Sequence, residues 1–172
     1  MTNVESFGQP GALPPPERQS RDPLTLVMVD DNIDEIFLAR RQARHQGIIN
    51  RFVSEQKSEN LISTLTDLYD SGVASNVLVL LDINMPKMDG FETLAAIRAH
   101  SHFRSLPVVM FSASDDAADM ERALACGANG YLVKPFTIEI FMSALGGLPQ
   151  IKYDLFLAPF GSERPMRYQL VQ

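Results

Sequence analysis

The sequence contains one cysteine, no long apolar run and no excess of positive charge. Cys126 alone cannot form an internal disulfide, so a disulfide framework is excluded. No apolar run approaches the ~20 residues that a membrane-spanning helix needs. The N-terminal residues lack the basic start and apolar core of an export signal. These absences predict a cytoplasmic protein that does not bind or cross a membrane.

The charge balance also argues against one class of partner. The net charge is -6, and no dense block of Lys and Arg occurs along the chain. Because nucleic acids attract basic surfaces, we expect no direct binding to nucleic acid. The chain is 45% hydrophobic and 21% charged, which is ordinary for a globular protein. Its 172 residues favour one domain with room for a tail.

The two ends of the chain differ in composition from its middle. Residues 1–23 are rich in proline and polar residues, so we expect a flexible leader that buries little apolar surface. Residues 24–148 carry the strand and helix patterns of one domain. Residues 149–172 are too few for a separate output domain, and Ile151 to Leu157 alternate as a strand would. This C-terminal extension could pair with a sheet edge, fold across the domain or bind a partner.

A short apolar run in the middle of the chain leads directly into a carboxylate. Val77 to Leu81 are five consecutive apolar residues, followed by Asp82. The run is too short for a typical buried helix, and its β-branched content favours a strand covered on both faces. Pro86 and Gly90 prevent the strand from continuing, so Asp82 should lie at its carboxyl end. Ligands of open α/β sheets bind at this edge.

Other apolar runs repeat this pattern of a strand followed by a polar residue. The remaining predicted strands are Leu24–Val29, which ends at Asp30 and Asp31, a weaker candidate at Ile48–Val53, Val108–Phe111, which ends at Ser112, and Gly130–Val133, which ends at Lys134. The five strands alternate with helical patterns, which predicts parallel pairing with right-handed crossovers. We therefore expect an α/β fold, a doubly wound parallel sheet in three layers.

The helical patterns between these strands have recognisable starts. Asn32 begins the first helix, whose apolar stripe contains Ile33, Ile36, Phe37 and Ala43. The other predicted helices begin at the capping residues Ser58 and Glu59, Asp89 and Glu92, Ser114 to Asp116, and Thr137.

The polar residues at the strand ends should share one edge of a parallel sheet. They are Asp30, Asp31, Asp82, Ser112 and Lys134. Three carboxylates within a few ångströms repel by roughly 4 kcal/mol per pair at an effective dielectric constant near 20, so the site requires protons or a cation. Mg²⁺ prefers such carboxylates together with water and phosphate oxygens. Ser112 and Lys134 could contact a phosphoryl group, and Asp82 could be a third metal ligand or the nucleophile.

Four motifs, in this order, resemble the receiver domain of two-component response regulators. They are Val-Asp-Asp-Asn at 29–32, Asp-Ile-Asn-Met-Pro-Lys-Met-Asp-Gly at 82–90, Phe-Ser-Ala at 111–113 and Lys-Pro-Phe at 134–136. The resemblance covers about residues 24–148 and implies the strand order 2-1-3-4-5. It also implies a signalling protein and no enzyme in the usual sense, with Mg²⁺-dependent self-phosphorylation and autodephosphorylation as its only chemistry.

The resemblance implies a role for each acidic residue. Asp82 would accept a phosphoryl group from the phosphohistidine of a sensor histidine kinase. Mg²⁺ would be held by Asp31, Asp82 and the backbone carbonyl of Asn84, with Asp30 acting through water.

The remaining roles fall to residues on the later strands. Ser112 and Lys134 would hold the phosphoryl oxygens, and Ser112 with Tyr131 would form the conformational switch. Asn84 and Ser114 would tune dephosphorylation, and the peptide bond between Lys134 and Pro135 would be cis.

The resemblance also implies partners. A single-domain response regulator signals by protein contact in a phosphorelay, so the sensor kinase and an unknown downstream protein are expected. A homodimer is possible, but the last predicted helix is short, lacks Lys and Arg and runs into Gly146 and Gly147, which leaves the dimer face open.

Three alternatives compete with this interpretation. A phosphatase of the haloacid dehalogenase type also places an Asp nucleophile at a strand end, but it needs a second Asp where this chain has Asn84. A receiver-like binding module would never take phosphate. A flavin-binding protein is disfavoured because Asp30 and Asp31 would repel a flavin phosphate.

Several of these residues also have purely structural explanations. Asp31 could cap a helix, and Asp89 is expected to do only that. Tyr131 could be ordinary core packing. His100 and His102 are expected to lie in a solvated loop, since no third metal ligand lies nearby in the sequence.

Overall fold

The computed structural model describes residues 24–48, 50–72, 76–147, 154–157 and 166–169. The expected leader at 1–23 lies outside these ranges, as do most residues of the C-terminal extension.

Five parallel strands form the central sheet, in the order β2-β1-β3-β4-β5. They are β1 (Thr25–Val29), β2 (Arg51–Glu55), β3 (Val77–Leu81), β4 (Val108–Ser112) and β5 (Gly130–Val133). Every residue of β1, β3 and β4 is buried, which matches their nearly continuous apolar sequences. The predicted doubly wound sheet and its strand order are confirmed.

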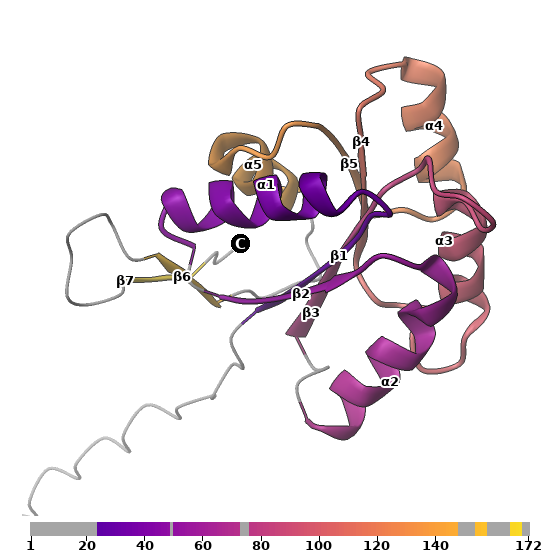
Figure 1. The fold of residues 1–172 in the computed structure, drawn as a ribbon, viewed down its shortest axis with the longest axis horizontal. Helices are drawn as coiled ribbons and strands as arrows, with labels where there is room; N and C mark the ends of the chain where they lie inside the picture. The colour runs from indigo at the N-terminus through magenta and orange to yellow at the C-terminus, as the bar shows by residue number, and fades with distance from the viewer. Residues whose placement is uncertain (1–23, 49, 73–75, 148–153, 158–165, 170–172) are drawn as a thin grey trace, which may run out of the picture.

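Helices cover both faces of the sheet (Figure 1). They are α1 (Ile33–His45), α2 (Leu61–Asp70), α3 (Gly90–Ala99), α4 (Ala117–Ala125) and α5 (Ile138–Gly146), with a 3₁₀ turn, η1 (Ser58–Asn60), before α2. One core cluster joins α1 and α5 to one face of the sheet, and a second cluster joins α2, α3 and α4 to the other. In β1, Leu26 and Met28 enter the first cluster while Val27 and Val29 enter the second, as the alternation of a strand requires.

Capping residues fix the starts of most helices where the sequence predicts them. Asn32 accepts a hydrogen bond from the backbone N–H of Asp34, and Thr137 accepts one from Ile140. Asp89 and Glu92 form a reciprocal capping box at the start of α3. Of the residues expected to begin α4, Asp116 is the N-cap.

The predicted apolar stripe of α1 is only half correct. Ile36 and Ala43 are buried together with Ala39, whereas Ile33 is 56% exposed and Phe37 is 65% exposed. The spacing of Ile36, Ala39 and Ala43 by three and four residues defines one face of a helix. Phe37 follows Ile36 by one residue, which turns it by about 100° away from that face.

Ser58 does not cap α2 with its side chain, in contrast to the sequence prediction. It begins η1, its side chain is buried, and its hydroxyl donates to the carbonyl oxygen of Met88, 2.7 Å away. The hydroxyl therefore links η1 to the loop that precedes α3 and does not cap the start of α2.

Two further strands belong to the C-terminal extension. β6 (Asp154–Leu157) pairs with β7 (Met166–Gln169) in an antiparallel two-stranded sheet. The strand pattern predicted for Ile151 to Leu157 is therefore present at its second half, and its partner is β7. Within the described residues, none of the helices is long and apolar enough to cross a membrane.

We predict that Gly90→Ala destabilises the protein by about 1–3 kcal/mol, the usual cost of overpacking. A Cβ atom at Gly90 would collide with the backbone carbonyl oxygen of Asp82 and lie 2.8 Å from the Cα atom of Ile83. Gly146→Ala is the matched control, since a Cβ atom there meets nothing within 4 Å. Chemical denaturation measures both free energies of unfolding, and equal values for the two variants would contradict the prediction.

Candidate functional site

The polar residues that follow the strands lie together at the carboxyl edge of the sheet. Val29 of β1 pairs with Leu81 of β3, and the backbone N–H of Asp82 donates to the carbonyl oxygen of Val29 at 2.9 Å. Asp30 and Asp82 therefore lie side by side, at the ends of the adjacent strands β1 and β3. On the other side, the backbone N–H of Lys134 donates to the carbonyl oxygen of Ser112 at 2.8 Å.

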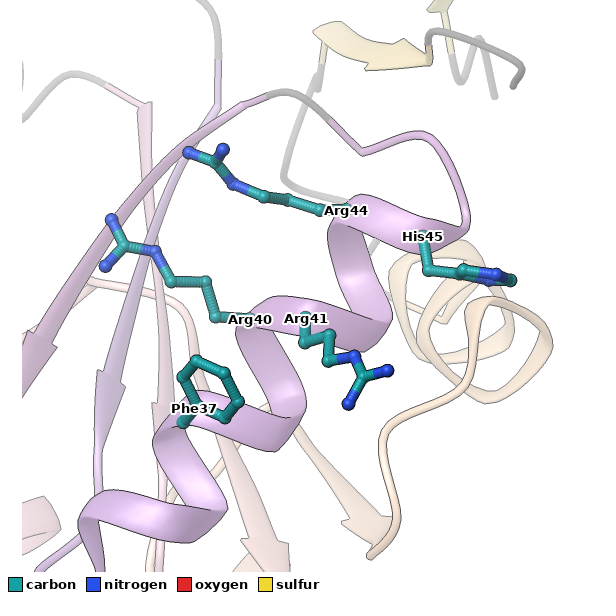
Figure 2. Close-up of a pocket in the computed structure, with 5 residues that line it drawn as sticks. All are labelled: Phe37, Arg40, Arg41, Arg44 and His45. Atoms are coloured by element: carbon teal, nitrogen blue, oxygen red, sulfur yellow. The ribbon is translucent and has the colours of Figure 1, made fainter. Parts of the chain in front are cut away.

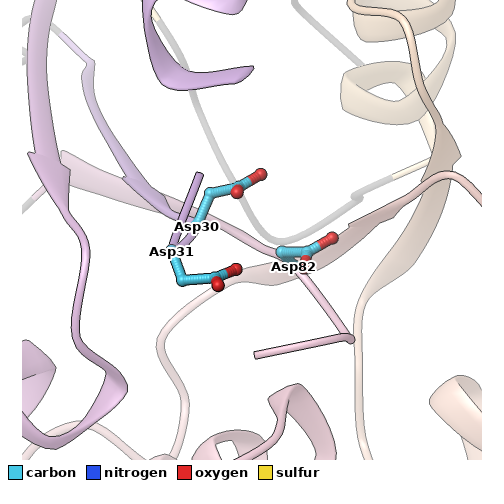
Figure 3. Close-up of side chains that lie close together, drawn as sticks. All are labelled: Asp30, Asp31 and Asp82. Atoms are coloured by element: carbon cyan, nitrogen blue, oxygen red, sulfur yellow. The ribbon is translucent and has the colours of Figure 1, made fainter. Parts of the chain in front are cut away.

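Three carboxylates converge at this edge (Figure 3). Asp30, Asp31 and Asp82 each place a carboxylate oxygen within 4.8 Å of the others. Asp30 and Asp82 are buried, at 1% and 6% exposure, while Asp31 is exposed. The three carboxylates lie close together, as the strand ends led us to expect, and their roles as metal ligands and phosphoacceptor stay a prediction.

Lys134 reaches into this group from the end of β5. Its Nζ atom lies 2.6 Å from Oδ2 of Asp30 and 3.1 Å from Oδ1 of Asp82. The other carboxylate oxygens accept backbone hydrogen bonds, from Asn32 to Asp30 at 2.9 Å and from Asn84 to Asp82 at 3.0 Å. The ammonium group therefore supplies part of the positive charge that the carboxylates require.

Burial and charge act in opposite directions on the two central groups. Burial raises the pKa of the Asp82 carboxyl above its usual value, and the negative charge of Asp30 adds to this, although Lys134 partly offsets both. Burial also works to lower the pKa of the Lys134 ammonium, but its hydrogen bonds and charge interactions with Asp30 and Asp82 outweigh burial and raise it. Lys134 is therefore held in its charged form.

The donor set fits a hard divalent cation. Three carboxylates face one ammonium group, so a negative charge remains at the site when all four groups are ionised. Oxygen donors of this kind suit Mg²⁺, which prefers carboxylates and retained water. The acidic cluster therefore fits a divalent metal ion, and the identity of its ligands stays a prediction.

Ser112 and Tyr131 lie on the later strands, β4 and β5. Ser112 is fully buried at the end of β4, and its Oγ atom accepts a hydrogen bond from the backbone N–H of Ser114 at 3.2 Å. The partly buried ring of Tyr131 packs against the second core cluster, and its hydroxyl donates to the carbonyl oxygen of Ser114 at 2.9 Å. Both side chains thus contact the same loop, and their role as a switch stays a prediction.

The segment after Asp82 is held by a contact that the sequence did not predict. The hydroxyl of Ser58 in η1 donates to the carbonyl oxygen of Met88. The next residue, Glu59, forms an ion pair with Lys87, with Oε1 3.2 Å from Nζ. Lys87 has a positive φ of 68°. Glu55 in turn accepts backbone hydrogen bonds from Gln56 and Lys57 at the start of the turn. Ser58 and Met88 are 30 residues apart, and no local pattern connects them.

Other residues considered from the sequence have structural roles. Asp89 caps α3. His100 and His102 lie in the loop before β4, where the rings of His100 and Phe103 stack at 4.5 Å and Tyr69 stacks on His102 at 5.8 Å. The peptide bond between Lys134 and Pro135 is cis, as the resemblance implies.

Comparisons with known proteins show the family of this chain. The family model of the response regulator receiver domain matches residues 26–146. The chain is 30% identical over 121 residues to the probable methanogenesis regulatory protein FilR2 of Methanothrix harundinacea, covering 70% of this chain and 78% of that protein. It is 43% identical over 68 residues to the probable chemotaxis protein CheY of Rhizobium etli, covering 40% of this chain and 53% of that protein.

The solved structures give the same result. The bacteriophytochrome response regulator AtBRR matches with a TM-score of 0.64 and 26% identity, covering 74% of this chain and 94% of that one. The matched stretch spans 50–58% of several curated relatives. The chain belongs to the family of response regulator receiver domains, in which phosphorylation and Mg²⁺ binding are typical.

We predict that Ser58→Ala loosens the segment after Asp82 and lowers the free energy of unfolding by about 1 kcal/mol, the usual value of one hydrogen bond. Hydrogen exchange should become faster at the amides of residues 84–89, because Met88 loses its link to η1. Ser54→Ala is the control, since Ser54 is exposed on β2. Unchanged exchange at residues 84–89 would show that the hydroxyl does not hold this segment.

We also predict that Asp82→Asn raises stability at neutral pH in the absence of divalent metal. The pKa of the Asp82 carboxyl is higher in the folded state than in the unfolded chain. Protonation of Asp82 therefore stabilises the folded state in acid, and this stabilisation is lost as the pH rises through the raised pKa. Asparagine is neutral at every pH, so the advantage of the variant should shrink as pH falls.

Thermal unfolding between pH 4 and pH 8 with a chelator measures this difference, with Asp70→Asn, on the exposed end of α2, as the control. A variant less stable than the wild type at pH 7 would show that attraction to Lys134 outweighs the burial of Asp82.

Proposed function

We propose that this chain is a response regulator that accepts a phosphoryl group on Asp82 from the phosphohistidine of a sensor histidine kinase. The observation that carries the proposal is the position of Asp82, buried at the strand end with one carboxylate oxygen 3.1 Å from the Lys134 ammonium. The signal then passes by protein contact to a downstream protein.

In the transfer, a carboxylate oxygen of Asp82 attacks the phosphorus atom. The new O–P bond forms as the P–N bond of the phosphohistidine breaks, and the imidazole nitrogen takes the electron pair. Lys134 shifts its interaction from Asp82 to a phosphoryl oxygen and offsets the added negative charge. The Ser112 hydroxyl donates to a second phosphoryl oxygen.

Asp31, Asp82 and the backbone carbonyl of Asn84 would hold Mg²⁺, and the bound ion would offset the negative charge of the phosphoryl oxygens. Within the described residues, no hydrogen bond or ion pair engages the Asp31 carboxylate, so it is available as a direct ligand. Asp30 already binds Lys134 and the backbone N–H of Asn32, which supports a role through water.

Ser112 and Tyr131 would report the change to the rest of the molecule. When the Ser112 hydroxyl turns to the phosphoryl group, its hydrogen bond with Ser114 is lost. The carbonyl oxygen of Ser114 also holds the Tyr131 hydroxyl, so movement of this loop changes the position of the ring.

The remaining features follow from this role. Residues 24–148 form the receiver domain. The protein acts in the cytoplasm, with self-phosphorylation and autodephosphorylation as its only reactions.

We predict that incubation with acetyl phosphate or phosphoramidate and Mg²⁺ adds one phosphoryl group, measured by intact-mass spectrometry. Asp82→Asn should abolish the gain because it removes the nucleophile, and a chelator should suppress it. Asp70→Asn, on the exposed end of α2, is the matched control and should be phosphorylated as the wild type is. The proposal would be disproved if folded wild-type protein gained no phosphoryl group with either donor. It would also be disproved if Asp82→Asn still gained one.

A further inference from the structure

The outer surface of α1 carries apolar side chains that the core does not use. Half of the large exposed hydrophobic side chains in the described part of the chain lie on this helix. They are Ile33, Phe37 and Leu38, of which Phe37 is the most exposed at 65%. Apolar side chains gathered on one surface element indicate a site of contact with another molecule.

A basic cluster begins where this apolar surface ends. Arg40, Arg41, Arg44 and His45 line an open pocket with Phe37 (Figure 2). Arg40 and Arg44 extend to the same side of α1 as Phe37, while Arg41 and His45 extend to the other side (Figure 2). Ile33, Phe37, Arg40 and Arg44 follow the spacing of four, three and four residues that places side chains along one face of a helix.

The charges of this cluster are unfavourable for the isolated helix. Arg40 and Arg44 are four residues apart, where like charges destabilise a helix by a few tenths of a kcal/mol. No ion pair within the described residues engages any of the three arginines. The helix dipole favours Arg44 and His45 in the last turn, but it does not explain Arg40 and Arg41.

One of these arginines is already fixed in position. The guanidinium of Arg40 lies 5.6 Å from the ring centroid of Phe52, and its Nη2 atom donates to the carbonyl oxygen of Phe52 at 3.3 Å. A guanidinium that is ordered in advance loses less entropy when it binds a carboxylate.

The surroundings favour an acidic protein segment over a nucleic acid. The cluster contains three arginines and no lysine, Asp34 and Glu35 lie on the same helix, and the whole chain has a net charge of -6. A phosphate backbone would meet this negative charge, whereas a short peptide can place its carboxylates at the arginines alone.

We propose that the face of α1 formed by Phe37, Arg40 and Arg44 binds an amphipathic acidic segment of a partner protein. An apolar side chain of the segment covers Phe37, and its carboxylates pair with the two guanidinium groups. Arg44 lies about 16 Å along the helix from Ile33, which is next to the carboxylate site, at a rise of 1.5 Å per residue. The docking face shares no residue with the carboxylate site, and the proposal goes beyond phosphoryl transfer.

The test uses a fluorescein-labelled helical peptide of about 16 residues with Leu and Glu on one face, long enough to span α1. Fluorescence anisotropy measures its affinity for the full chain. We expect Arg44→Glu to weaken binding about tenfold or more, because it replaces an attraction with a repulsion. Phe37→Ser should also weaken peptide binding, because it removes the apolar side chain that the peptide leucines contact.

Arg51→Glu is the matched control with the same change in charge. Arg51 is exposed on β2, where alternation turns it away from Phe52 and from α1, so this variant should bind the peptide as the wild type does. Equal weakening by Arg44→Glu and Arg51→Glu, or equal binding of a peptide with Glu but no Leu, would overturn the proposal. So would tighter binding of a single-stranded oligonucleotide, or self-association that Arg44→Glu abolishes.

Phosphorylation by acetyl phosphate separates this proposal from the previous one. Arg44→Glu should still gain one phosphoryl group, and Asp82→Asn should still bind the peptide. Loss of peptide binding in Asp82→Asn would contradict a docking face that is independent of Asp82.

Discussion

The pairing of Lys134 with Asp30 and Asp82 is the interaction on which the site depends. Two carboxylates that are almost fully buried would not stay ionised side by side without a cation between them. The pairing requires β1, β3 and β5 to end at the same level, although β4 separates β3 from β5. The parallel register of the sheet therefore fixes the electrostatics of its edge.

Much of this edge could be predicted from the sequence, because the apolar runs that form β1, β3, β4 and β5 lead into polar residues. Parallel strands then bring Asp30, Asp82 and Lys134 to one edge without any knowledge of their distances. The sequence could not show which oxygen each group would contact. Lys134 and Asp30 are 104 residues apart, and their 2.6 Å contact depends on side-chain conformations that no local pattern encodes.

The failures of the sequence prediction have two different causes. Ser58 has the residue type of a helix cap, but a hydroxyl can equally donate to a distant carbonyl, and here it donates to Met88. Phe37 has the residue type of a core side chain, but Ile36, Ala39 and Ala43 form the face that meets the sheet. Periodicity alone cannot separate two overlapping apolar faces on one helix.

The exposure of Phe37 follows from that choice of face, because turning α1 to bury the ring would withdraw Ile36 and Ala43 from the core. The two alanines also let the helix lie close to the sheet, where a phenylalanine would not fit. Packing explains why an apolar residue faces outward, and Arg40 contacts Phe52 while Arg44 lies in the last turn of α1, but neither contact explains why both arginines continue the line of Phe37. Since like charges at this spacing oppose helix formation, a surface that binds carboxylates accounts for both features of α1.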